Sequence, residues 1–115
     1  MNIDDNGVAT IAKNEEIDVK RLTDAMASVV TLELLIPLKT GGEERSELRF
    51  DEPTGAHVES MTKVQPHKSG EIAMRIIGEC CGLGPDEMKQ LRSRDVMRLS
   101  QVFRYFLPDS PSGMF

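Results

Sequence analysis

The chain has 115 residues, of which 39% are hydrophobic and 29% charged, and it contains no Trp. This length and composition are typical of one soluble globular domain that folds without metals or disulfides, and they exclude a disordered or membrane protein. The longest apolar stretch, residues 34–38, falls far short of the roughly 20 residues that cross a bilayer. The N-terminus does not resemble a secretory signal, so we expect a cytoplasmic protein with no membrane contact.

The formal net charge of -5 is unevenly distributed along the chain. Residues 1–60 contain thirteen Asp or Glu and six Lys or Arg, a net of -7, whereas residues 61–115 contain six and eight, a net of +2. The basic residues near the C-terminus are Lys89, Arg92, Arg94, Arg98 and Arg104. A pI near 5.0, and the lack of aromatic residues between these charges, argue against nucleic-acid binding and favour a solvated helix face.

Residues 1–28 are polar and acidic and show no sustained apolar period. Ile17, Leu22 and Met26 permit only a short helix within residues 15–27. We therefore predict a flexible acidic arm over residues 1–28, with weak helical tendency.

A β-hairpin is predicted directly after this arm. Apolar residues alternate from Val29 to Leu38, and a second alternating run over residues 44–50 follows a Gly41-Gly42 turn. Pro37 cannot donate a ladder hydrogen bond, so we expect it near the end of the first strand or on a sheet edge. Such a strand also has unpaired backbone groups at its edge, which suggests self-association.

Three or four helices are predicted after the hairpin. Thr54 is expected to cap a short helix with Val58 and Met61 on one face, and residues 62–68 form a loop. Further helices are expected over residues 70–81 with Ser69 as N-cap, from Pro85 to about residue 91, and from Ser93 until Pro108. The fold class is thus α+β, an N-terminal two-stranded antiparallel hairpin covered on one face by helices, with a flexible tail over residues 109–115.

No group of residues in the sequence has the spacing of a catalytic or metal-binding site. Cys80 and Cys81 are adjacent and poorly placed to bridge each other, so we expect small hydrophobic residues on a packed helix. His57 and His67 have no metal-ligand spacing, and nothing pairs a nucleophile with a base. The sequence predicts no enzyme, no cofactor and no metal.

Several motifs occur in a fixed order: LELLIPL, then ELRFDEPTG, then EIAMRIIGECCGLGPDEMKQLRSRDVMRLSQVFRYFL. In this order they resemble the small tail assembly chaperones of contractile-tailed, Mu-like phages and prophages. The residues at the matching places are Pro37, Leu48, Pro53, Thr54, Gly55, Gly82, Leu83, Pro85, Leu91, Asp95 and Val96. The resemblance covers residues 29–108, which we take as the tail assembly chaperone domain.

The resemblance implies a binding protein that holds the phage tape measure protein, a long helical polypeptide, and keeps it soluble until the tail tube forms. It also implies a site of action in the bacterial cytoplasm, absence from the mature virion, and a longer form made by translational frameshifting. Because the last predicted helix has a broad apolar face, we expect the partner-binding residues to be Val102, Phe103, Phe106 and Leu107.

A small DNA-binding regulator is the alternative function. Residues 85–91, a turn at Arg92-Ser93, and a final helix bearing Arg94 and Arg98 have the order of a helix-turn-helix. Asp95 argues against it, because it would lie in the first turn of the recognition helix, close to phosphate charge.

Overall fold

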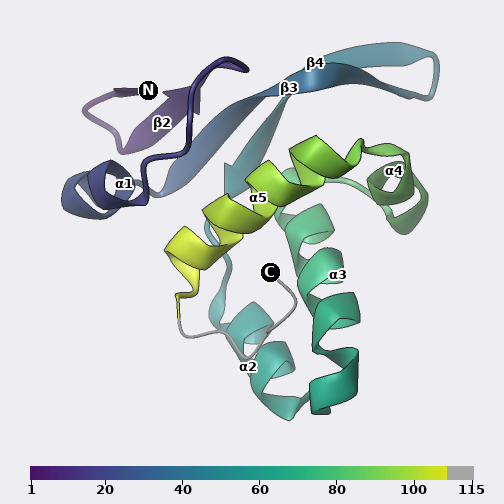
Figure 1. Cartoon of the computed structure of the whole chain (residues 1–115). Coiled ribbons are helices and arrows are strands. Elements are labelled where there is room, and N and C mark those ends of the chain that lie inside the picture. Colours follow the sequence, from purple (N-terminus) through teal and green to yellow (C-terminus); the bar gives the residue numbers. More distant parts are fainter. Residues whose placement is uncertain (109–115) are drawn as a thin grey trace.

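A four-stranded mixed sheet forms one layer of the fold, and helices lie against one of its faces (Figure 1). The computed structural model describes residues 1–108. The strands, in the order in which they neighbour one another, are β1 (Asn2–Ile3), β2 (Val8–Ile11), β3 (Val29–Thr40) and β4 (Glu43–Asp51). β2 pairs with β3 in parallel, whereas the other two pairs are antiparallel. The α+β class is confirmed, but the predicted two-stranded sheet is only half of the observed one.

The predicted hairpin is present as β3 and β4. Its register runs from Val29 opposite Asp51 to Thr40 opposite Glu43. Gly41 and Gly42 have φ values of 56° and 84°, the positive values that a tight two-residue hairpin turn demands and that glycine adopts without steric cost. The sequence therefore predicted both the strands and the turn.

Pro37 lies inside β3 and not at its end. The pairing of β3 with β4 is irregular between Glu33 and Leu38, and the strand then continues to Thr40. A proline is tolerated at such an irregularity because no regular ladder hydrogen bond is required of it there. Pro37 thus lies three residues before the end of β3 and outside the part that pairs with β2, in keeping with the expected place near the strand's end or on a sheet edge.

Residues 1–28 contribute two strands and a helix, so the flexible-arm prediction omitted part of the fold. Ala9, Ile11 and Leu22 are fully buried. The helix, α1 (Val19–Ala25), starts at Asp18, whose side chain accepts a hydrogen bond from the Arg21 backbone amide. The helix lies within residues 15–27, where a short helix was expected. The strands escaped prediction because β1 and β2 are too short to show a period, and β2 is buried only through its pairing with β3.

The helices after the hairpin are α2 (Gly55–Lys63), α3 (Ser69–Cys81), α4 (Pro85–Gln90) and α5 (Ser93–Phe106), with a 3-10 turn at Pro66–Lys68. Three or four helices were expected after the hairpin and four follow it; with α1, the described chain has five α-helices. Ser69 and Ser93 are the first helical residues and not the N-caps, which are Lys68 and Arg92. Val58 and Met61 were expected to share one face of α2; Met61 is buried, whereas Val58 is 43% exposed. The predicted tail over residues 109–115 lies outside the described residues.

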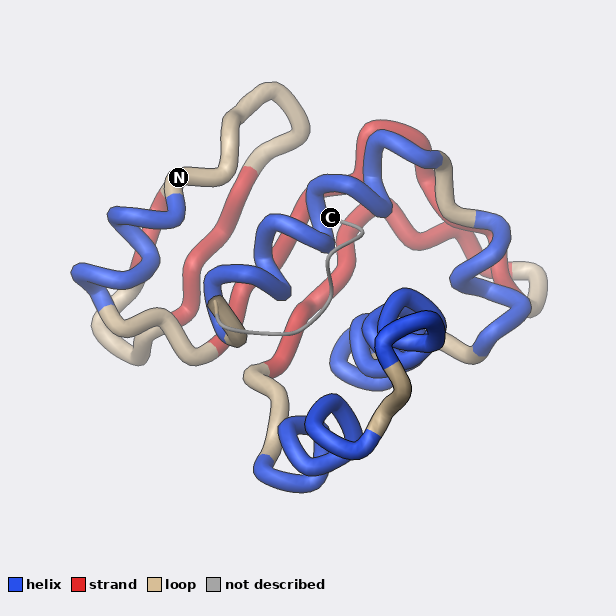
Figure 2. The backbone as a smooth tube through the Cα atoms, turned by 60° about the horizontal axis from the view of Figure 1, so that its bottom comes forward, coloured by secondary structure: helices blue, strands red, loops and turns tan. Residues whose placement is uncertain are grey.

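The main core lies between the sheet and the helices α3 and α5. Figure 2 shows α5 lying over the strands of the sheet. Alternate residues of β3 and β4 point toward the helices, among them Val30, Leu32, Leu48 and Phe50, which are all fully buried. They meet the apolar stripes of α3 and α5, and all three elements belong to one hydrophobic cluster.

Candidate partner-binding groove

The four residues predicted to bind a partner lie at the C-terminal half of α5. Val102 and Phe103 are fully buried, and Phe106 and Leu107 are partly buried against the core. The Phe106 ring stacks on Phe50, with 5.5 Å between the ring centroids and 16° between the planes. Most of this face is therefore occupied by the chain itself, and its binding of a partner stays a prediction.

The first turn of α5 is attached to the sheet by a buried carboxylate. Asp95 has no exposed surface, although it is charged. Its Oδ1 accepts a hydrogen bond from the Leu35 backbone amide at 3.0 Å, and its Oδ2 accepts one from the Ile36 amide at 3.3 Å. These amides lie in the irregular part of β3, where Asp95 takes the place of a strand partner.

Arg98 extends the same connection to the N-terminal segment. Its Nη1 donates to the Asp95 carboxylate at 3.1 Å and to the Glu33 carbonyl at 2.7 Å. Its Nη2 donates to the carbonyl of Ala12 at 3.1 Å, directly after β2. We call this pair the Asp95–Arg98 cluster. It explains why an Asp follows Leu91 in the motif, a role that sequence reasoning missed.

The helix-turn-helix arrangement is not supported by this geometry. A recognition helix must present its first turn to the major groove, whereas here Asp95 and Arg98 face the sheet. Arg98 is bound by two backbone carbonyls and a carboxylate, so it has little capacity left for a phosphate.

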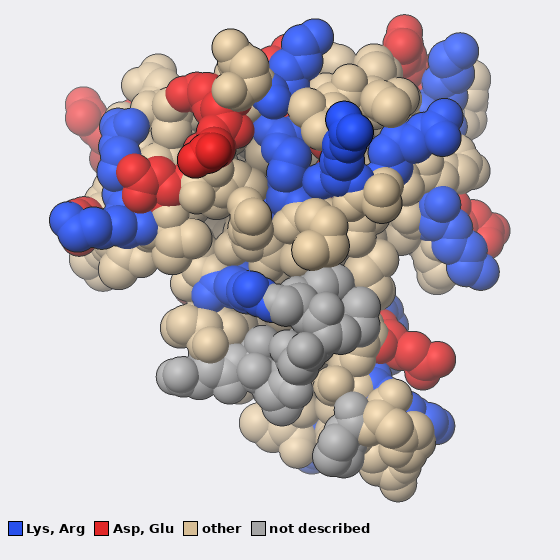
Figure 3. Space-filling view, viewed as in Figure 1, with Lys and Arg blue, Asp and Glu red and all other residues tan. Residues whose placement is uncertain are grey.

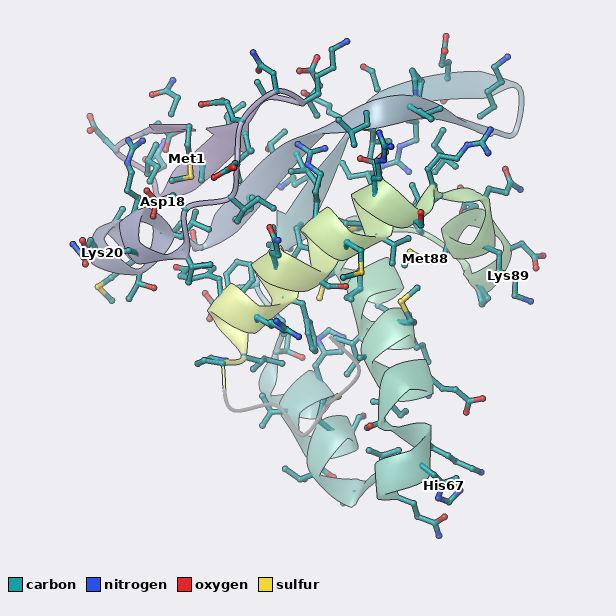
Figure 4. All side chains as sticks on the ribbon, in the orientation of Figure 1. Met1, Asp18, Lys20, His67, Met88 and Lys89 are labelled. Carbon is teal, nitrogen blue, oxygen red and sulfur yellow. The ribbon has the colours of Figure 1, made fainter. Side chains whose placement is uncertain are left out.

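A second feature is an open groove of about 1320 Å³ along α3 and α4, which we call the α3–α4 groove. It is lined by His67, Ser69, Gly70, Glu71, Met74, Arg75, Gly78, Glu79, Leu83, Gly84, Pro85, Met88 and Lys89. Figure 4 shows its two ends, with Met88 and Lys89 on α4 and His67 before the start of α3.

The groove forms where the chain reverses direction after α3 and continues into α4, which packs close to α3. The Leu83 amide donates to the Gly78 carbonyl at 2.8 Å, which folds the chain over the end of α3. A Cβ added at Gly78 would lie 2.9 Å from Met88 Cγ and 3.0 Å from the Leu83 carbonyl oxygen, so only glycine allows this approach. Pro85 opens α4, and the Glu87 carboxylate accepts from the Gly84 amide at 3.0 Å.

The groove combines an apolar floor with a charged rim. Leu83 and Met88 are almost buried, and Met74 is partly exposed. On the α3 side the rim carries charges spaced four residues apart: Glu71, Arg75 and Glu79. Arg75 Nε lies 3.7 Å from Glu79 Oε1, so this pair is compensated at the surface. Met74 and Met88 supply flexible side chains that adapt to an irregular apolar partner.

His57 has a structural role that the sequence did not reveal. Its Nδ1 accepts a hydrogen bond from the Thr54 amide at 3.0 Å, which satisfies a free donor at the start of α2. Its Nε2 lies 3.0 Å from a carboxylate oxygen of Glu79 on the groove rim. His57 thus links α2 to α3 behind the groove.

The two cysteines, Cys80 and Cys81, are buried and are not activated as nucleophiles. Burial raises the pKa of the Cys80 thiol to about 12, with the charges of Glu79 and Asp51 adding to the shift. Burial likewise raises the pKa of Cys81 to about 12. Both thiols are free and protonated at neutral pH, and a protonated thiol is a poor nucleophile.

Within residues 1–108, no group of three or more His, Cys, Asp or Glu is placed to hold a metal ion. In the same residues, no helix combines the length and the apolar content that crossing a membrane requires.

A protein-family model matches most of the chain. The family model described as phage tail assembly chaperone proteins, E, or 41 or 14, matches residues 31–108. No curated protein and no solved structure matches the chain. The match runs from β3 to the end of α5 and includes the groove and the Asp95–Arg98 cluster, while β1, β2 and α1 lie outside it.

Proposed function

The chain belongs to the phage tail assembly chaperone proteins, and we propose that it binds the tape measure protein and keeps it soluble until the tail tube is built around it. This family is not known for enzymatic activity, and a protein partner in the tail is in keeping with its role. The single observation that carries the proposal is the α3–α4 groove, an open apolar surface inside the family-matched region.

The dimensions of the groove fit one amphipathic helix. It follows most of α3, whose 13 residues correspond to a length of about 20 Å at 1.5 Å per residue. An amphipathic helix binds in such a groove by placing apolar residues from successive turns on the floor and leaving its polar face in water. Met74, Leu83 and Met88 supply this floor. The charged rim would keep the protein soluble when the groove is empty.

The groove is a better binding surface than the face of α5 predicted from the sequence. Val102 and Phe103 are already buried, so they would reach a partner only if α5 left the sheet. Phe106 and Leu107 retain some exposed surface and would contribute only at the margin. A chaperone must also release its client, and reversible contact with an open groove meets that need without partial unfolding.

Further parts of the proposed function follow from the resemblance to the tail assembly chaperones of Mu-like phages. We propose that the protein acts in the bacterial cytoplasm, is absent from the finished virion, and has a frameshift-extended form. Self-association through the hairpin is proposed at the outer edge of β4, because β2 covers the other side of β3 over Val29–Leu32. That outer edge carries exposed charges such as Glu43, Glu47 and Arg49, which oppose strand-to-strand pairing and make any such contact weak.

Co-expression with the tape measure protein of the same phage tests this function. We expect the wild-type chain to keep the tape measure protein in the soluble fraction and to co-purify with it. Met74→Glu places a charge on the partly exposed floor of the groove and is expected to weaken capture about tenfold or more. Met97→Glu is the matched control, because Met97 is 52% exposed on α5 and does not line the groove.

Thermal unfolding of both variants shows whether they remain folded. Loss of capture by Met74→Glu with an unchanged unfolding transition, and normal capture by Met97→Glu, would support the groove. Equal capture by the two variants would place the binding surface elsewhere, and an insoluble tape measure protein beside the wild-type chain would reject the chaperone function itself.

A further inference from the structure

Three basic side chains at the junction of α4 and α5 have no partner within the described chain. Lys89, Arg92 and Arg94 are all exposed, and none forms an ion pair or a side-chain hydrogen bond with another residue of 1–108. Most neighbouring arginines differ in this respect. Arg98 is held in the Asp95–Arg98 cluster, and Arg75 lies against Glu79.

These charges adjoin the groove. Lys89 lines it next to Met88, and Arg92 and Arg94 follow within five residues, across the turn from α4 into α5. Figure 3 shows Lys and Arg side chains gathered over the N-terminal half of α5 on the face in view. Lys89 thus lines the groove, and Arg92 and Arg94 follow it along the chain; we call these three residues the basic end.

The other wall of the groove has a different charge pattern. Along α3, the acidic Glu71 and Glu79 flank Arg75, and Arg75 and Glu79 compensate each other. The α3 wall thus carries one net negative charge. The end of α4 and the turn into α5 carry Lys89, Arg92 and Arg94, whereas Asp86 and Glu87 lie in the first turn of α4. A helix bound along the groove would therefore be favoured when its end near Lys89 carries acidic residues, while residues of either charge are tolerated along α3.

We propose that the α3–α4 groove selects amphipathic helices with an acidic end, whose Asp or Glu side chains lie against Lys89, Arg92 and Arg94 while the apolar stripe covers Met74 and Met88. This rests on the proposed function and adds the chemistry and the orientation of the bound segment. The basic end could attract carboxylates or phosphates alike. An acidic protein helix is favoured over nucleic acid because the groove lining contains no Phe, Tyr or Trp on which a base could stack.

The test uses synthetic peptides that cover the amphipathic segments of the tape measure protein, each made as the natural sequence and with its terminal Asp and Glu changed to Asn and Gln. Binding is measured for the wild-type chain and for the triple variant K89E/R92E/R94E. The control K13E/K20E/K39E carries the same change of charge on three exposed lysines outside the groove.

We expect the triple variant to bind the acidic peptides about tenfold more weakly at about 0.1 M salt, since exposed charge pairs contribute modestly and three are reversed together. The difference should nearly vanish at about 1 M salt, where the Debye length is about 3 Å. The control variant, and the peptides without terminal charge, should show no such difference.

Each other result counts against the inference. Equal binding by the wild type and the triple variant overturns it and leaves the chaperone function standing. Equal weakening by the control variant shows that only net charge acts, which also overturns it. Binding of a random DNA duplex that the triple variant alone abolishes, with peptide binding unchanged, assigns the basic end to nucleic acid instead. Absence of any peptide or tape measure binding by the wild type rejects the proposed function together with the inference.

Discussion

Two helical surfaces of this protein have similar apolar patterns but differ in how far the chain itself covers them. The stripe of α5 packs on the sheet, where Leu99, Val102 and Phe103 are fully buried. The surface between α3 and α4 remains an open groove, in which the partly exposed Met74 lies beside the nearly buried Leu83 and Met88. The difference teaches that apolar spacing identifies a helix face that must be covered, but it does not say whether the chain itself or a partner covers it.

The Asp95–Arg98 cluster attaches the N-terminal part of α5 to the sheet, and its removal has the largest expected effect on this comparison. Asp95→Ala leaves the Leu35 and Ile36 amides without their acceptor and leaves the mostly buried Arg98 side chain without its carboxylate. We expect a loss of about 3–5 kcal/mol in the free energy of unfolding, measured by urea denaturation.

Asp86→Ala is the matched control for this substitution, because Asp86 is an exposed Asp in the first turn of α4. Its loss should cost less than about 1 kcal/mol. If both variants unfolded at the same urea concentration, water would be replacing the Asp95 hydrogen bonds, and α5 would be held by apolar contacts alone.

The end of α5 gives the second test. Phe106→Ser together with Leu107→Ser removes the ring that stacks on Phe50 and the partly buried Leu beside it. We expect a loss of about 2–3 kcal/mol in unfolding free energy, because both side chains pack against the core. The fraction that stays folded should still capture the tape measure protein if the groove is the binding surface.

The opposite outcome would restore the prediction made from the sequence. A double variant with an unchanged unfolding transition and weakened capture would assign binding to Phe106 and Leu107 and would make the end of α5 an open surface like the groove.

The groove floor gives the smallest expected effect on stability. Gly78→Ala would gain the helix propensity of Ala but must move Met88 or the Leu83 carbonyl. We expect a net loss of about 1–2 kcal/mol, measured by thermal unfolding, and weaker capture because α4 shifts relative to α3. Gly55→Ala is the control, since nothing lies within 4 Å of a Cβ at Gly55. Stabilisation of the protein by Gly78→Ala would mean that α4 moves away at little cost.

Much of the matched region could be predicted from the sequence because its signals are local. The alternation over β3, the Gly41-Gly42 turn and the Pro85 start of α4 each act through a few neighbouring residues. The strands of the N-terminal segment could not be predicted in this way, because β2 has only four residues and exists through its parallel pairing with β3.

The groove is harder to derive from the sequence than the fold, for a related reason. The sequence correctly indicated apolar faces on α3, α4 and α5. Of the four residues it predicted for the partner surface, Val102 and Phe103 are buried, and Phe106 and Leu107 are partly buried. Two signals for the groove were present in the Gly82-Leu83-Gly84-Pro85 turn and in Gly78, but a glycine does not reveal which side chain fills the space above it.

The sequence by itself determined the hairpin, the order and limits of most helices, and the family to which the chain belongs, because these depend on short-range backbone preferences and on motif order. Only the tertiary structure decided that Asp95 is buried against β3, that residues 1–28 complete the sheet, and that the groove stays open. These depend on contacts between residues far apart in the chain, such as Leu35 with Asp95, which no local pattern encodes.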